Sequence, residues 1–274
     1  MWFASEFNGI SLPRGNFSLA APRAFAANRL QPTGALLGDY DLEGLGNRLV
    51  QQAYQVEFTI AQCDAQAKMD ALMGVARRSG TLKITNNLQT RRTTAKITSI
   101  GWSTTIDDWR ARQARISLQF SAEPFWYDDV LTTLAFTNQD YINLRTVNNA
   151  GNARAIKHLV LTITTALPGA TTIFIEPTGP RYYNEFKYGA QRYGIVSSLI
   201  PAPAACQLTY NAATGATLVI DAGRATVQVG GVDAYANTSK PDTQTALLWL
   251  DPGPAVVHFS RAVSGSIAWR NCWV

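Results

Sequence analysis

Alternation of apolar and polar residues with a period of two is the feature that most constrains this chain. Residues 54–60, 91–103 and 110–121 carry this alternation, as residues 116–120 show with Ile, Leu and Phe at every second position. A period of two is typical of β-strands that bury one face. The chain is therefore expected to be mostly β, with several strands in its first half.

One segment of the first half has a different period. Between residues 62 and 78, Ala65, Met69 and Leu72 recur at steps of three and four, which predicts one amphipathic helix. Arg77 and Arg78 suit the negative end of its dipole, and the following Gly80 is placed to end it. Residues 1–126 are thus predicted to form an α+β domain, a β-sandwich or barrel with one packed helix.

A glycine-rich stretch precedes these strands. Residues 31–46 contain Gly34, Gly38, Asp39 and Asp41, and the stretch is too long for an ordinary hairpin loop. A projecting arm that orders against a neighbouring subunit and a flexible loop are equally compatible with these residues.

The second half shows only strand patterns, separated by turns that carry Gly or Pro. A boundary is expected near residues 123–129, where a proline follows a strand and large aromatic residues come next. Residues 127–274 are therefore predicted to form an antiparallel β-sandwich. Its expected strands include 155–165, 172–176, 217–221, 226–229, 247–250, 256–260 and 266–273.

Composition restricts the classes of partner. Of the 274 residues, 46% are hydrophobic and only 16% are charged, and residues 1–126 hold +4 of the net charge of +5. A surface with few charges is common where partners cover it, whereas a nucleic-acid binder usually carries a denser basic patch. We expect no dedicated nucleic-acid site, no membrane span and no leader at Met1–Ile10.

The sequence offers little for chemistry. Its two histidines lie within strand patterns, and its three cysteines, Cys63, Cys206 and Cys272, follow no metal or redox spacing. We predict no catalytic residue, no metal and no cofactor, and hence no enzyme. A glycosidase that draws two carboxylates from separate strands is the remaining enzymatic alternative.

Arginines at the helix end and the strand starts form the candidate interface set. Solvated strand-end charges, contacts with an adjacent subunit, and a lining near passing DNA are three interpretations of them. With the glycine-rich stretch, the predicted subunit-interface residues are Arg77, Arg78, Arg91, Arg92, Arg110, Arg112, Gly34, Gly38, Asp39 and Asp41.

The order of these elements resembles the distal tail protein (Dit) family of long-tailed, siphovirus-type bacteriophages. Four stretches carry the likeness: Ser-Ala-Glu-Pro-Phe-Trp-Tyr at 121–127, an Asn-Ala-Gly-Asn turn and strand within 147–163, two strands within 216–229, and Leu-Trp-Leu-Asp-Pro-Gly with its following strands within 248–273. The glycine-rich stretch, the strand and the helix match the first domain of the family in order. Each motif alone is common, and their joint order carries the resemblance.

The resemblance implies a structural role. In the family, the first domain builds a hexameric ring that joins the tail tube to the tail-tip or baseplate proteins, and the second domain has a galectin-like fold. The implied partners are further copies of the chain, the tail tube protein, the tail-tip hub and the tape measure protein. The implied location is the virion tail tip, after assembly in the host cytoplasm.

A carbohydrate-binding module or adhesin is the alternative function. Tyr182 and Tyr183 are the candidate glycan contacts, because exposed aromatic rings can stack on sugars. A fold shared with carbohydrate-binding proteins does not establish that activity.

Overall fold

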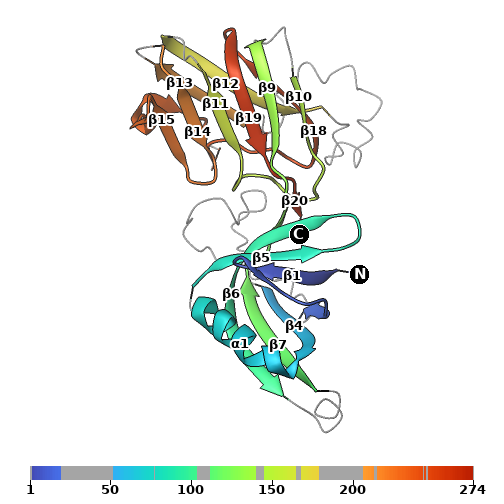
Figure 1. Cartoon of the computed structure of the whole chain (residues 1–274). Coiled ribbons are helices and arrows are strands. Elements are labelled where there is room, and N and C mark those ends of the chain that lie inside the picture. The colour runs from blue at the N-terminus through green and yellow to red at the C-terminus, as the bar shows by residue number, and fades with distance from the viewer. Residues whose placement is uncertain are drawn as a thin grey trace, which may run out of the picture. The chain divides into compact units, whose positions relative to one another are not determined.

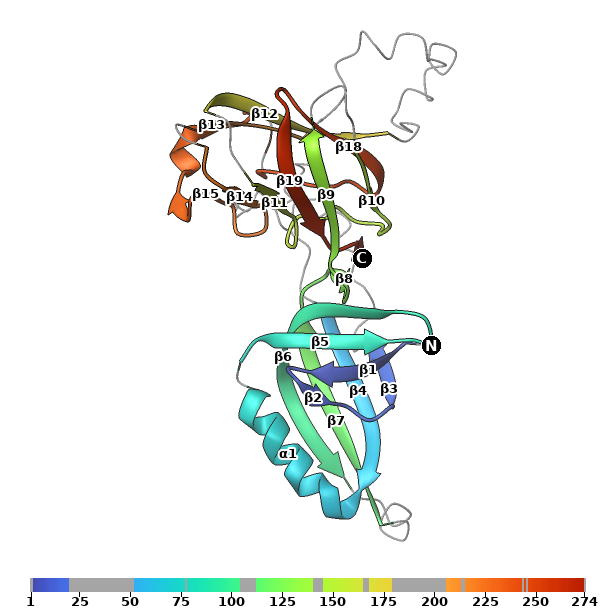
Figure 2. The same cartoon turned by 45° about the horizontal axis from the view of Figure 1, so that its top comes forward.

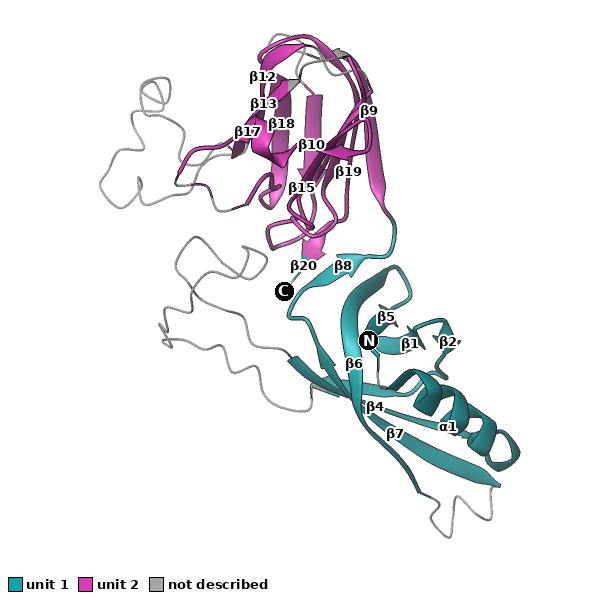
Figure 3. Ribbon diagram, turned by 90° about the vertical axis from the view of Figure 1, so that its left-hand side faces the viewer, with its two compact units in different colours: residues 1–36, 40–130, 273–274 teal, residues 37–39, 131–272 magenta. Residues whose placement is uncertain are grey.

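The computed structural model divides into two compact units, which are coloured separately in Figure 3. Within the described residues, unit 1 runs to Val130 and includes Trp273, and unit 2 runs from Leu131 to Cys272. The structure describes residues 2–19, 52–76, 78–103, 112–139, 145–164, 168–178, 206–212, 215–242, 244 and 246–273. The predicted arm at 31–46 lies outside these residues.

Unit 1 is built on one sheet with the strand order β2-β1-β5-β6-β7-β4-β3, antiparallel throughout (Figure 1). Two further strands extend it, since β8 pairs with β6 and β20 pairs with β8. The strands are β1 (Phe3–Phe7), β2 (Ile10–Ser11), β3 (Asn16–Leu19), β4 (Gln52–Ala61), β5 (Gly80–Thr85), β6 (Thr90–Ser103), β7 (Gln113–Ala122), β8 (Trp126–Asp128) and β20 (Cys272–Trp273).

This sheet curls around its own core. In Figure 2, β1 and β5 lie across β4, β6 and β7, and β6 is strongly bent. The bend follows a register shift between Ile97 and Ser99, because a bulge increases local twist. Ile116, Leu118 and Phe120 point inward and are fully buried, as their alternation predicted. The expectation of a sandwich or barrel is thus met by a single curled sheet.

The helix α1 (Gln62–Ala76) covers β4, β6 and β7. Ala65 and Leu72 are its buried residues. The helix ends at Ala76 rather than at the predicted residue 78, and the Arg78 backbone amide donates to the Val75 carbonyl at 3.1 Å. The glycine expected to end the helix, Gly80, instead begins β5.

Unit 2 consists of two antiparallel sheets. One has the order β10-β18-β12-β13-β17 and the other β16-β15-β14-β11-β19-β9. The strands are β9 (Thr132–Gln139), β10 (Arg145–Asn149), β11 (Val160–Ile163), β12 (Gly169–Pro177), β13 (Cys206–Ala212), β14 (Leu218–Asp221), β15 (Thr226–Val229), β16 (Val232–Asp233), β17 (Thr238–Ser239), β18 (Gly253–Phe259) and β19 (Val263–Trp269), with a 3-10 helix η3 at Tyr235–Asn237.

Side chains from both sheets of unit 2 form its core. Phe136 of β9 and Phe259 of β18 lie 5.3 Å apart between ring centroids, although they belong to different sheets. Leu161 and Ile173 are fully buried in the same way. The predicted antiparallel sandwich and the mostly-β class are therefore confirmed, whereas the galectin-like detail stays a prediction.

A buried asparagine organises one end of unit 2. The Asn149 side chain is fully buried, and its amide donates to the carbonyls of Ala153 (2.8 Å) and Leu250 (3.2 Å). Its Oδ1 accepts from the backbone amides of Gly151 and Cys272, both at 3.2 Å. One side chain thus ties the turn after β10 to two segments more than 100 residues away.

The apolar run Leu247–Leu250 is not a strand, which corrects that expectation. It lies buried as irregular chain. The Trp249 backbone amide has no strand partner there and donates instead to Cys206 Sγ at 3.3 Å. An apolar run of four residues does not by itself distinguish a buried strand from a buried loop.

The cysteines are expected to differ in reactivity. Cys63 is exposed, whereas Cys206 and Cys272 are buried, and burial raises the pKa of the Cys206 thiol. Since the thiolate is the reactive form, one thiol per chain should react quickly with Ellman's reagent in the native protein, and three after unfolding. Cys63→Ser should abolish the fast phase, and a fast phase that survives this change would contradict the placement of Cys63.

The aromatic junction belongs to unit 1. Strand β8 lies in the first sheet, and Trp126 and Tyr127 are buried there. The division therefore falls between Val130 and Leu131, after the predicted boundary between 126 and 127. The chain returns to unit 1 at Trp273, which sequence spacing could not indicate.

No helix in the described parts of the chain has the length and apolar character needed to span a membrane. No three His, Cys, Asp or Glu side chains in those ranges are arranged to hold a metal ion.

Candidate interface site

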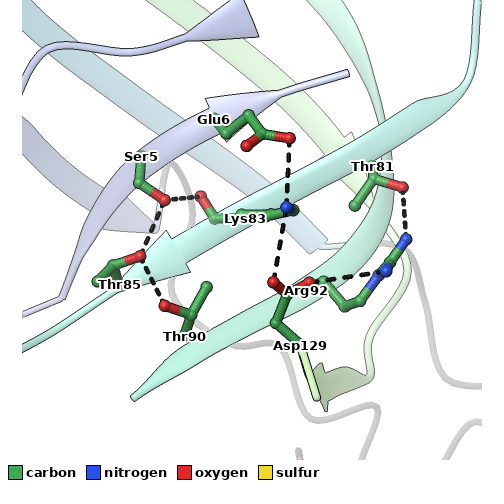
Figure 4. Close-up of polar contacts among 8 residues, drawn as sticks. All are labelled: Ser5, Glu6, Thr81, Lys83, Thr85, Thr90, Arg92 and Asp129. Atoms are coloured by element: carbon green, nitrogen blue, oxygen red, sulfur yellow. Dashed lines mark hydrogen bonds and ion pairs between the residues drawn. The ribbon is translucent and has the colours of Figure 1, made fainter. Parts of the chain in front are cut away.

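Charged side chains meet on the outer face of the unit 1 sheet (Figure 4). Lys83 Nζ lies 3.4 Å from Glu6 Oε1 and 3.5 Å from Asp129 Oδ2. Arg92 Nη1 lies 3.6 Å from Asp129 Oδ1, and Arg92 Nη2 donates to Thr81 Oγ1 at 3.1 Å. We call Glu6, Lys83, Arg92 and Asp129 the charged ladder. Its two cations and two anions balance.

The β5–β6 hairpin places this ladder. Lys83 lies opposite Arg92 in its register, and residues directly opposite each other share a face. Beside the ladder, a line of hydroxyl groups crosses the same strands: Ser5 Oγ lies 2.9 Å from Thr85 Oγ1, which lies 3.1 Å from Thr90 Oγ1. Because the charges are half-exposed, each ion pair contributes about 1 kcal/mol or less. The ladder mainly fixes the positions of the strands and of Asp129.

Arg91 points to the other side of β6 and lies between two indole rings. Its guanidinium carbon is 3.9 Å from the centroid of the Trp273 ring and 4.8 Å from that of Trp2. Trp273 Nε1 donates to Asp128 Oδ1 at 2.9 Å, and Asp128 lies opposite Arg91 in the sheet. We call Trp2, Arg91, Asp128 and Trp273 the arginine clasp.

The electrostatics of the clasp follow from its burial. Desolvation lowers the pKa of Arg91, and the nearby Asp128 carboxylate opposes this effect. The Arg91 Nε is buried and finds no hydrogen-bond partner in the described ranges. The faces of the two indoles therefore stabilise the cation beside its Nε, where no hydrogen bond does. This holds the last strand of the chain against the first sheet.

Strand β6 has an open edge. Its first residues pair with β5, but from Lys96 to Ser103 it pairs on one side only, with β7, within the described chain. Trp102 lies in this segment with 48% of its surface exposed. An unpaired edge is a template for another strand. Strand β3, which ends the sheet order, likewise pairs on one side only, with β4, in the described residues.

The four predicted interface arginines that the structure describes do not gather at one place. Arg92 is in the charged ladder and Arg91 in the clasp, so both have partners within unit 1. Arg112 precedes β7, at the opposite end of that strand from β8, and adopts a φ of 52°. Its carbonyl accepts from the Gln62 amide at 2.9 Å, where the helix begins. Arg78 is exposed beyond α1.

The remaining predicted residues of the subunit interface and of the glycan contact are not among those that the structure describes. Their contacts with an adjacent subunit or with a glycan stay a prediction. Arg77, Arg110, Gly34, Gly38, Asp39, Asp41, Tyr182 and Tyr183 lie outside the described residues.

The predicted interface set contained one residue of the clasp, Arg91, and one residue of the ladder, Arg92. Lys83 could have been found, because a four-residue loop between Thr85 and Thr90 sets Lys83 opposite Arg92. Trp2 and Trp273 carried no such signal, since they lie at opposite ends of the chain. The neighbouring carboxylates have different partners, since Asp128 accepts from Trp273 of the clasp and Asp129 pairs with Lys83 and Arg92 of the ladder.

The architecture, two antiparallel β units of which the first carries one helix on a curled sheet, is similar to that of a solved phage distal tail (Dit) protein. The Dit protein (gp 19.1) of SPP1, described as a paradigm of the hub adsorption apparatus of phages that infect Gram-positive bacteria, matches this chain over 100% of both chains with a TM-score of 0.59 and 9% identity. The resemblance predicted from the sequence is thus confirmed for the fold.

Two baseplate structures of phage P2 in its activated conformation also match. The one with Ca has a TM-score of 0.39 at 9% identity and covers 81% of this chain and 78% of the other. The one with Sr has a TM-score of 0.38 at 10% identity and covers 80% and 78%. Neither a model of a known protein family nor a curated protein sequence matches the chain.

Proposed function

We propose that this chain is a structural protein of a phage tail tip, in which unit 1 forms a hexameric ring that joins the tail tube to the tail-tip or baseplate complex. The observation that carries the proposal is the match to the SPP1 Dit protein along the full length of both chains. At 9% identity this match concerns the fold. The proposal therefore also needs surfaces on unit 1 through which copies could join into a ring.

The open strand edges of unit 1 are such surfaces. One copy would offer the side of β6 from Lys96 to Ser103 that has no strand partner among the described residues, and the next copy would offer the corresponding side of β3. Contacts between two different surfaces close into a ring when the rotation per subunit divides the circle. Pairing would also remove the aggregation hazard of exposed edges.

The proposed partners follow from this position. They are further copies of the chain, the tail tube protein, the tail-tip hub and the tape measure protein. The proposed location is the virion tail tip, after assembly in the host cytoplasm. The role is non-enzymatic: on the described chain, Asp128 and Asp129 both bond to neighbours within unit 1, which suits a structural use of these carboxylates.

Imaging of intact particles tests the proposal. Averaged electron micrographs should show six copies around the tail axis, and a ring of six 29.9-kDa chains has a mass of about 180 kDa. Trp102→Glu places a charge on the open edge and should reduce ring formation at least about tenfold. Val232→Glu, at a 70% exposed position of unit 2, is the matched control. A chain found off the axis, without rotational copies, would refute the ring.

A further inference from the structure

Two neighbouring residues near the end of the described chain are held by different units. Cys272 belongs to unit 2 and Trp273 belongs to unit 1. Cys272 is fully buried, and Trp273 lies in the arginine clasp. The chain therefore leaves one unit and is bound in the other across a single peptide bond.

The turn after β10 holds Cys272, and we call residues 149–153 the Asn149 turn. The Cys272 amide donates to Asn149 Oδ1 at 3.2 Å, and the Cys272 carbonyl accepts from the Ala153 amide at 3.1 Å. A Cβ atom at Gly151 would lie far inside van der Waals contact with the Cys272 carbonyl oxygen. Because glycine alone lacks this atom, the close approach of Cys272 to the turn depends on Gly151.

The arginine clasp holds Trp273 in the same way within unit 1. The Trp273 ring lies 3.9 Å from the Arg91 guanidinium carbon, and its Nε1 donates to Asp128 Oδ1 at 2.9 Å. Strand β20 also pairs with β8 in the first sheet. Both residues of the dipeptide are thus bound through several contacts.

The other passage of the chain between the units is different. It runs through Val130 and Leu131, which lie outside the strands and are exposed. Two such residues can absorb a small displacement through their backbone dihedrals. At Cys272 and Trp273, by contrast, the planar peptide fixes consecutive Cα atoms about 3.8 Å apart, so a displacement of one residue reaches the next.

We propose that Cys272 and Trp273 form a strap that couples the Asn149 turn of unit 2 to the arginine clasp of unit 1. The clasp has a closed state, with the Trp273 ring on Arg91, and an open state, with this ring in solvent. Displacement of Cys272 from the turn withdraws Trp273 and favours the open state. Since coupling between two sites is reciprocal, opening of the clasp also weakens the hold on Cys272.

The strap makes the stability of the first sheet depend on one turn of unit 2. It goes beyond the proposed tail function and does not depend on it, because every group involved belongs to a single chain. The purified full chain is therefore enough to test it.

Gly151→Ala displaces Cys272 without changing the clasp itself. Gly223→Ala is the matched control, since a Cβ atom there would meet the Lys157 carbonyl oxygen about as closely, elsewhere in unit 2. Trp273→Ala and the double variant complete a double-mutant cycle. Hydrogen exchange of the β6 and β8 amides reports the first sheet, and the Trp273 indole N–H, observed by nitrogen-15 NMR, reports whether the clasp is closed.

We expect Gly151→Ala to raise the exchange rates of the β6 and β8 amides at least about tenfold and to shift the Trp273 indole resonance toward that of an exposed indole. Gly223→Ala should change neither. In the Trp273→Ala background, Gly151→Ala should add nothing, because no ring remains to be withdrawn. Equal effects of the two glycine variants, or additive effects in the double variant, would overturn the inference.

The reverse experiment decides the case in which the turn accommodates the alanine without moving Cys272. Trp273→Ala should raise the exchange rates of the Cys272 and Ala153 amides by a similar factor. The Ala155 amide, which donates to the Leu250 carbonyl at 2.8 Å, is the reference and should be unchanged. Full protection of the Cys272 and Ala153 amides in Trp273→Ala would refute the strap.

Discussion

Replacing Trp273 with alanine is expected to lower the free energy of unfolding of unit 1 by about 3 kcal/mol. The change removes the indole face 3.9 Å from the Arg91 guanidinium and the hydrogen bond to Asp128. A desolvated cation–π contact contributes about 1–2 kcal/mol, the hydrogen bond to a carboxylate about 1.5 kcal/mol or more, and part of the indole surface returns to water. Of its two indole neighbours, the Arg91 guanidinium would retain only Trp2.

Hydrogen exchange followed by mass spectrometry can localise this loss. Amides of β6 and β8 should exchange faster in the variant, because local and sub-global openings report the stability of the unit that contains them. Amides of β14, in unit 2, should be unchanged.

Trp102→Ala is the matched control, since this tryptophan lies on the same sheet, half-exposed and outside the clasp. It should cost less than about 1 kcal/mol in the isolated chain. Arg91→Lys should fall between the two, because an ammonium keeps the charge but loses the planar stacking. Equal protection in the Trp273→Ala and unmodified proteins would show that the clasp contributes nothing to unit 1.

Asn149→Leu is expected to have a larger effect, about 4–5 kcal/mol, on unit 2. The buried amide makes four hydrogen bonds, and a leucine of similar volume leaves two carbonyls and two amides without that partner. Each buried group left unsatisfied costs about 1–3 kcal/mol, reduced where water or a rearranged backbone reaches it. Urea unfolding followed by near-ultraviolet circular dichroism should show the unit 2 transition at a much lower midpoint.

Asn148→Leu provides the control one residue away. The Asn148 side chain is exposed, and its carbonyl, which accepts from Trp269 Nε1 at 3.1 Å, is unaffected by a change of side chain. A midpoint shift of similar size in both variants would mean that the leucine itself, rather than the lost hydrogen bonds, destabilises the turn.

Local periodicity predicted the strands well where one face is buried along the whole element. Strand β7 illustrates this, because Ile116, Leu118 and Phe120 are all fully buried. The helix was predicted with its start correct and its end two residues late, since an arginine pair and a glycine suit a helix terminus and a following turn alike. The run at 247–250 was wrongly predicted to be a strand. All four residues are buried, so they show no alternation of apolar and polar residues that could distinguish a strand from a loop.

The candidate site depended on long-range pairing and was mostly beyond local patterns. Arg91 was singled out, but as an interface charge rather than as a cation between two indoles. Its partner Trp273 donates to Asp128 across a sequence separation of 145. Which residues meet in this way depends on how β6, β8 and β20 pair in the folded sheet. The identity of either residue alone does not indicate that pairing.

The return of the chain to its first sheet has a consequence for biosynthesis. Strand β20 follows every strand of unit 2 in the chain, so the ribosome makes it after all of them. The first sheet therefore gains its final strand after the whole of unit 2 has been made. A chain that terminates before residue 272 lacks that strand and the Trp273 ring that packs on Arg91, so its first sheet should be less stable.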